Sequence, residues 1–207
     1  MQKAALGCGV ILLLVILLTV FTAIGIYNGL VGSLQGVDAQ WAQVQNVYQR
    51  RADLIPNLVQ TVKGAADFEK STLTEITEAR ASVGQVKIDA NQAPGDPAQL
   101  EQFQKAQAQL GGALSHLLVV VERYPDLKAN SNFRDLQAQL EGTENRISVE
   151  RGKFNEAVQN YDTRIRRFPA VLMASMMGFQ PKPYFAATAG ADTPPKVNFD
   201  FGGKSAH

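Results

Sequence analysis

The chain has 207 residues, of which 20 are basic and 19 acidic, so its formal charge is +1. This balance argues against nucleic acid as a partner, because proteins that bind nucleic acid usually carry a basic face or stripe. The cysteine count of one (Cys8) excludes an intrachain disulfide, and two histidines cannot supply the ligand spacings of a zinc site. We therefore expect no cofactor and no metal.

The N-terminal part of the sequence is strongly apolar. Residues 4–37 contain no charged side chain, and residues 10–26 form an almost unbroken apolar run. About 20 such residues cross the core of a bilayer as a helix. A cleaved signal peptide ending near Ala23 and Gly25 is the alternative, but the run is long for one. We predict that residues 1–33 form a membrane anchor.

The charges on either side of this run predict its orientation. Lys3 and the amino terminus precede it, whereas Arg50 and Arg51 follow it at a distance and come after Asp38. Positive charges favour the cytoplasmic side of a membrane. We therefore expect a single-pass protein whose soluble domain lies on the extracytoplasmic, periplasmic side.

Small residues recur at the end of the apolar run and just beyond it. They are spaced by three and four positions, so they share one face of a helix. Small residues on one face allow membrane helices to approach closely, which predicts self-association. The alternative is that the glycines loosen the junction at the membrane surface. The predicted packing residues are Gly25, Gly29, Gly32, Ser33 and Gly36.

Beyond the anchor, apolar residues recur at helical spacing over residues 34–169. The pattern predicts that the membrane helix continues over residues 34–62 and is followed by helices at 65–88, 98–123 and 133–168. Short links favour an up-down-up-down four-helix bundle, so the predicted fold is all-α, with an N-terminal transmembrane helix continuing into that bundle. The last helix shows the most regular spacing, a coiled-coil-like series of Phe133, Leu140, Ile147, Phe154, Tyr161 and Phe168.

Three charged residues occupy positions where the helical pattern places apolar ones: Arg51, Glu144 and Arg151. An unpaired charge in a core is costly, so we expect a structural polar seam, for example an ion pair between Arg51 and Glu144 that fixes the helix register. A ligand or regulatory pocket is the alternative. Pro56 lies within the first helix, where it removes a backbone hydrogen bond and should kink the helix.

The residues after the fourth helix fall into two segments. Because that helix runs back toward the membrane, the apolar, methionine-rich residues 170–185 should be membrane-proximal and contact lipid or a partner. A last core element under the bundle is the alternative. Residues 186–207 are rich in glycine and proline and predict an extended tail. The apolar side chains proposed at the membrane are Leu172, Met173, Met176, Met177 and Phe179.

Catalytic motifs are missing from this sequence. It contains no Gly-x-Ser-x-Gly elbow and no His-Glu-x-x-His pair. We therefore predict that the chain is not an enzyme.

Several longer stretches are specific enough to compare with known families. Residues 50–59 read Arg-Arg-Ala-Asp-Leu-Ile-Pro-Asn-Leu-Val, residues 122–130 read Glu-Arg-Tyr-Pro-Asp-Leu-Lys-Ala-Asn, and residues 141–147 read Glu-Gly-Thr-Glu-Asn-Arg-Ile. From about residue 27 to residue 199 the sequence resembles the LemA family of bacterial membrane proteins. It departs from that family at Asp162, where asparagine is usual.

The resemblance implies a single-span protein of the bacterial cytoplasmic (inner) membrane with a four-helix bundle domain. It implies no established enzymatic activity, association with other membrane proteins, including a metalloprotease, and sometimes a cytoplasmic domain. We therefore expect a non-enzymatic, homo-oligomeric membrane scaffold that organises the membrane or recruits a membrane protein partner. Its expected partners are membrane lipid, itself and another membrane protein. The alternative is an accessory or sensory subunit that regulates a membrane enzyme such as a metalloprotease.

Overall fold

The computed structural model describes residues 2–64, 68–86, 88–89 and 91–186. Every regular element within these ranges is a helix, which confirms the predicted all-α class. The predicted tail from residue 186 lies outside the described residues, apart from Ala186 itself. In chain order the helices are α1 (Gln2–Lys63), α2 (Lys70–Gln85), α3 (Pro97–Val121), α4 (Pro125–Ala129), α5 (Ser131–Arg166) and α6 (Ala170–Met177).

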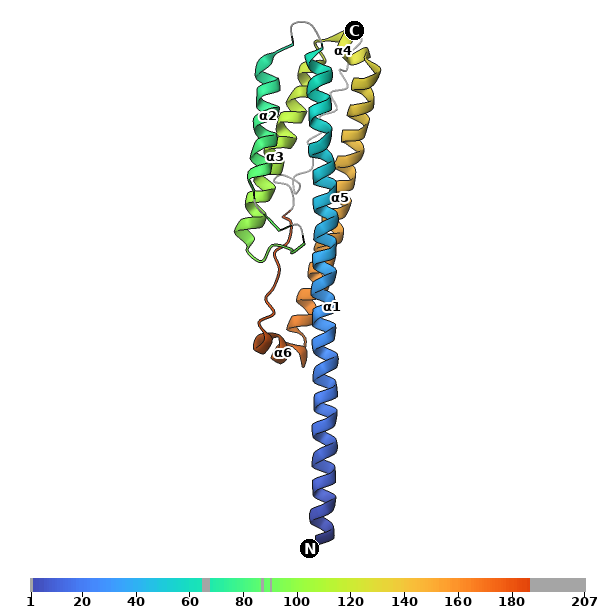
Figure 1. Ribbon diagram of the computed structural model, residues 1–207, viewed down its shortest axis with the longest axis vertical. Coiled ribbons are helices and arrows are strands. Elements are labelled where there is room, and N and C mark those ends of the chain that lie inside the picture. Colours follow the sequence, from blue (N-terminus) through green and yellow to red (C-terminus); the bar gives the residue numbers. More distant parts are fainter. Residues whose placement is uncertain (1, 65–67, 87, 90, 187–207) are drawn as a thin grey trace, which may run out of the picture.

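Helix α1 is one continuous rod of 62 residues. At 1.5 Å per residue it is about 93 Å long. Its apolar N-terminal part extends away from the rest of the molecule (Figure 1), and the side chains of residues 10–18 are exposed there. The same helix then enters the packed part of the protein without a break. The predicted long apolar N-terminal helix is therefore confirmed.

The long helices pack in pairs that lie side by side. Helix α1 contacts α5 along most of the length of α5, and α2 contacts α3. Figure 1 shows that the directions of α1, α2, α3 and α5 alternate along the chain. Helix α6 follows α5 at the end of the packed region from which the N-terminal part of α1 extends, and it contacts both α1 and α5.

The helix ends follow local sequence signals. Asp96 caps α3 by accepting a hydrogen bond from the Ala98 amide, and Asn130 caps α5 by accepting from two backbone amides. Gly178 ends α6 with a φ of 76°, a left-handed conformation that glycine adopts without steric strain. Pro125 ends the preceding helical pattern as expected, but it also begins the short α4, because proline fits the first position of a helix.

The core consists of two hydrophobic clusters stacked along the long axis. One surrounds Trp41, and the other surrounds Ile55 and lies farther from the N-terminus of α1. Both clusters draw side chains from α1, α3 and α5. Arg51, Gln107 and Thr143 are buried polar residues at positions between the two clusters in these three helices. We call these three residues, together with Glu144, the polar layer.

Candidate functional site

The polar layer is organised around Arg51 of α1. Its Nη1 donates a hydrogen bond to Oε2 of Glu144 on α5 at 2.9 Å. Its Nη2 donates to the backbone carbonyl of Gln107 on α3 at 3.1 Å and also to the side-chain oxygen of Gln107. The structure therefore places Arg51 and Glu144 in one ion pair, and the guanidinium connects three helices.

The two members of this ion pair differ strongly in exposure. The Arg51 side chain is 4% exposed, whereas the Glu144 side chain is 63% exposed. A carboxylate so open to solvent contributes little to stability, because water screens the attraction. The buried guanidinium has the larger demand for hydrogen-bond acceptors, and its Nε has no partner among the described residues.

Arg151 lies two helical turns after Glu144 on α5, and its side chain contacts a different part of the chain. Its Nη2 donates to the carbonyl of Ala186 at 2.8 Å, and its guanidinium carbon lies 4.8 Å from the centre of the Phe185 ring. The structure therefore does not bring Arg151 into the ion pair of Arg51. Burial raises the pKa of the Tyr48 phenol, and the positive charges of Arg151 and Arg51 oppose that rise.

Arg151 belongs to a set of α5 side chains that hold residues 179–186, which we call the C-terminal strap. The Asn155 amide both accepts from the Phe185 backbone amide at 2.9 Å and donates to the Phe185 carbonyl at 3.1 Å. Phe185 is buried, with its ring 5.3 Å from that of Phe154 and 6.1 Å from that of Trp41. The strap thus completes the core cluster around Trp41.

Two further α5 residues hold the strap nearer to α6. Tyr161 donates from its hydroxyl to the Gln180 carbonyl at 3.0 Å, and Asp162 accepts from the Lys182 amide at 3.1 Å. These contacts are made to the backbone of the strap, so they fix its path independently of most of its side chains.

The sequence did not identify three of these residues as site residues: Gln107, Asn155 and Asp162. Gln107 could have been found, because it interrupts a seven-residue apolar series formed by Leu100, Leu114 and Val121. Asn155 and Asp162 had no such signal, since a polar residue on a helix is ordinarily solvated. Their role depends on the position of a segment that lies 20 to 30 residues away in sequence.

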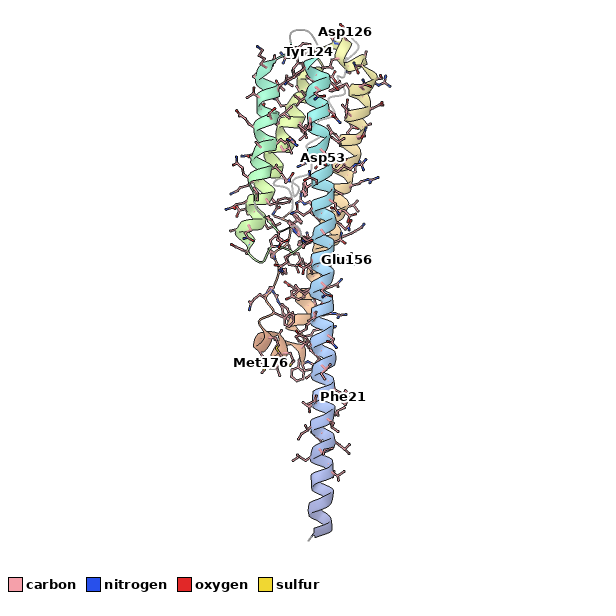
Figure 2. All side chains as sticks on the ribbon, in the orientation of Figure 1. Phe21, Asp53, Tyr124, Asp126, Glu156 and Met176 are labelled. Carbon is pink, nitrogen blue, oxygen red and sulfur yellow. The ribbon has the colours of Figure 1, made fainter. Side chains whose placement is uncertain are left out.

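Helix α6 forms the second part of the candidate site. It packs against α1 near Ile26, and the Phe179 ring lies 6.1 Å from the ring of Tyr27. Figure 2 shows Met176 at the end of the packed region from which α1 continues toward Phe21. Of the residues predicted to be membrane-proximal, Met173 and Phe179 pack against the core cluster. Leu172, Met176 and Met177 are exposed.

The small residues of α1 lie at the same level. Gly25, Gly32 and Gly36 are exposed, and a Cβ atom added at any of them would meet nothing within 4 Å outside its own helix. Gly29 differs, because its carbonyl accepts a hydrogen bond from Nη1 of Arg164 at 3.2 Å. Ser33 is part-buried and bonds back to carbonyls of α1. Most of the glycine face is therefore not covered by its own chain.

Pro56 lies inside α1, which stays α-helical through it. The proline cannot donate to the Ala52 carbonyl four residues earlier. Nε of Arg80 on α2 donates to that carbonyl instead, at 3.2 Å. The predicted kink stays a prediction, but the missing helix bond is replaced by a contact between helices.

The described residues offer little to catalysis. They contain no group of three or more His, Cys, Asp or Glu side chains that could hold a metal ion. His116 is exposed, and its Nδ1 lies 2.8 Å from Oε2 of Glu75. The features with functional potential are the polar layer, the strap and the apolar surface at the end near Tyr27.

These features define a class of protein before any relative is considered. One helix of this chain is long and apolar enough to cross a membrane, and it continues into a helical domain. The class is that of helical proteins with one apolar helix able to span a membrane. The LemA family model matches residues 40–199, and the chain belongs to this family.

The chain is similar to several bacterial proteins. The magnetosome protein MamQ of Magnetospirillum gryphiswaldense is 25% identical over 187 residues, covering 81% of this chain and 67% of the relative. The magnetosome protein MamQ 2 of Paramagnetospirillum magneticum is 26% identical over the same shares. The protein LemA of Metamycoplasma hominis is 22% identical and covers 72% of this chain and 63% of the relative. Together with the apolar helix, the family indicates a membrane-associated protein.

Proposed function

We propose that this chain is a non-enzymatic, homo-oligomeric scaffold of the bacterial inner membrane that organises the membrane or recruits a membrane protein partner. One observation carries the proposal. At the end of the domain near Tyr27, α6 exposes apolar side chains, and α1 carries exposed glycines on another of its faces. These two surfaces suit lipid and a second membrane helix better than they suit water.

The position of α6 along α1 supports contact with lipid. Residues 10–26 rise about 25 Å as a helix, close to the thickness of a bilayer core. Tyr27 then lies at the boundary, where tyrosine is favoured. Because Phe179 contacts Tyr27, the exposed Leu172 and Met176 of α6 lie at the same boundary. The arginines that end α5 lie nearby, and anionic headgroups attract such basic side chains.

The geometry of α1 supports self-association. At 3.6 residues per turn, Gly25, Gly32 and Gly36 lie on roughly the opposite side of the helix from Leu30 and Trp41. Those two side chains are buried in the protein's own core. The exposed glycines therefore lie off the buried face of α1, at the edge of its contact with α5, and small residues there let a second helix approach closely.

The arrangement of the domain fits this role. We infer that α1, α2, α3 and α5 act as one four-helix bundle, which is supported by core clusters drawing on several of these helices. Lys3 before the span supports placing the bundle on the extracytoplasmic side. In that arrangement the spans associate in the membrane and the bundles pack beside one another above it.

Cysteine crosslinking in native membranes tests the proposal. In a Cys8→Ser background, Gly32→Cys should form a disulfide-linked dimer, because a Cβ at that position meets open space. Val31→Cys is the matched control, since Val31 is next to Gly32 in the chain but points about 100° away from it around α1. A dimer from Gly32→Cys and little from Val31→Cys supports the scaffold.

Two results would oppose it. Equal crosslinking at both positions would indicate random collision, and an absence of dimer would remove the glycine face from the proposal. Stoichiometric capture of a membrane enzyme such as a metalloprotease, without self-association, would favour the accessory or sensory subunit instead.

A further inference from the structure

A partly enclosed hollow of about 290 Å³ opens between α1, α3 and α5, next to the polar layer. Leucine side chains, among them Leu114, Leu118 and Leu140, form its apolar walls. Arg51 and Glu144 line its polar edge, and Gly111 lies in the wall contributed by α3. The hollow thus combines an apolar interior with a buried cation.

We propose that this hollow binds a small amphipathic carboxylate, with a body the size of one ring or a short alkyl chain. The apolar body lies against the leucines. The carboxylate takes the place of Glu144 on the Arg51 guanidinium. This binding site is separate from the surface that carries the scaffold proposal.

The state of Arg51 argues for an anionic ligand. Three hydrogen bonds join its guanidinium to Glu144 and Gln107, and its buried Nε has no partner among the described residues. A guanidinium has five donors and binds carboxylates in a planar, two-pronged geometry. The protein's own groups therefore leave part of this donor set unused.

The exposure of Glu144 argues that it can be displaced. Its side chain is 63% exposed, so it can turn into water and keep its hydration. Arg51, at 4% exposed, is held in place by Gln107 and cannot follow. A ligand carboxylate arriving in the hollow would then meet a fixed cation whose one carboxylate partner among the described residues, Glu144, is easily solvated.

The size of the hollow sets the size of the ligand. Its volume is about twice that of the ~150 Å³ cavity that holds a molecule such as benzene. It lies at the lower end of the range for small-molecule pockets. A Cβ at Gly111 would meet nothing within 4 Å, so a larger side chain there would take up free space rather than displace the core.

Calorimetric titration of the full chain in lipid nanodiscs tests the proposal, with 3-phenylpropanoate as the probe and empty nanodiscs as the blank. We expect saturable binding at one site per chain. Glu144→Gln removes the internal competitor for Arg51 and should tighten binding about three- to fivefold, the effect of an exposed ion pair. Glu141→Gln is the matched control, because Glu141 lines the same hollow but pairs with Gln137. It should change the Kd by less than about twofold.

Two loss variants complete the test. Arg51→Met should abolish binding, and Gly111→Leu should weaken it without removing any charge, which covers the case in which Arg51→Met does not fold. The proposal is overturned if neither the wild type nor Glu144→Gln binds above the blank. It is equally overturned if Glu144→Gln and Glu141→Gln change the Kd alike, or if the neutral 3-phenylpropanamide binds as tightly as the carboxylate.

Discussion

Arg51 shows how two partners of one side chain can have unequal importance. Gln107 holds the guanidinium through both its backbone and its side-chain oxygen, in a buried position. Glu144 reaches it from solvent. The stabilisation from an ion pair depends on how strongly solvent screens it. The charged contact with Glu144 therefore contributes less to stability than the neutral contacts with Gln107.

Substitutions at the ion pair should therefore have unequal effects. Glu144→Gln should lower the free energy of unfolding by less than about 1 kcal/mol, because the exposed carboxylate is well screened. Arg51→Ala should lower it by about 2–4 kcal/mol, because it leaves a void and unsatisfied acceptors on Gln107. Urea denaturation of the full chain in detergent measures both. Equal losses for the two variants would show that the ion pair itself stabilises the fold.

At this scale the sequence is informative where a polar residue breaks an apolar series. Arg51, Glu144 and Arg151 are marked in this way, and the structure places the first two together. The sequence does not reveal that Arg151 contacts Phe185 and Ala186. Residues on the same face of a helix can have different neighbours at different positions along its axis. The unpartnered Nε of Arg51 depends on side-chain packing that no residue pattern encodes.

Among the elements, the C-terminal strap depends on a few side chains of α5. Asn155 makes two hydrogen bonds to the Phe185 backbone, in the way one strand of a sheet bonds to another. The part of the chain that the structure describes supplies no neighbour strand to the strap, so these side-chain bonds fix its position beside the core.

Asn155→Ala should therefore loosen the strap. We expect the Phe185 amide to exchange with deuterium about five to ten times faster, the effect of losing roughly 1 kcal/mol of local stability. Hydrogen–deuterium exchange of the full chain measures this. Asn160→Ala is the control, because Asn160 is an exposed residue of the same helix. Unchanged exchange at Phe185 in Asn155→Ala would mean that burial of its ring alone holds the strap.

Pro56 offers a second test at the level of an element. Pro56→Ala should raise the free energy of unfolding by about 1–2 kcal/mol, because alanine is the better helix former and restores the amide that the Ala52 carbonyl lacks. The gain should stay below the full proline penalty of about 3 kcal/mol, since Arg80 already donates to that carbonyl. Thermal or urea unfolding of both forms decides it. A loss of stability would show that the packing of α1 needs the proline.

Helix positions could be predicted better than helix ends. The apolar spacing places all the long helices, whereas the second helix runs only from Lys70 to Gln85 instead of residues 65–88. Phe68 packs in the core although it lies outside any helix. The pattern of buried apolar residues is therefore longer than the helix itself, and the predicted helix comes out too long. The short α4 has too few residues to show a period of its own.

For the whole molecule, the length of α1 is the central fact. One helix forms the apolar extension and then a wall of the packed domain, so a change in the angle of the anchor is carried directly to the domain. The long apolar N-terminal helix and the all-α class could be predicted, since both rest on composition and period. The assembly of several chains could not, because an exposed apolar surface does not state whether lipid, a partner or a second copy covers it.

The mass and symmetry of the purified particle test the scaffold most directly. Full-length protein extracted in mild detergent can be weighed by native mass spectrometry and imaged as single particles. We predict a symmetric homo-oligomer whose subunits meet along the glycine face of α1, and we predict that Gly32→Leu with Gly36→Leu shifts it toward monomer. A wild-type particle that is monomeric, or one whose assembly is unchanged by these two substitutions, would contradict the account.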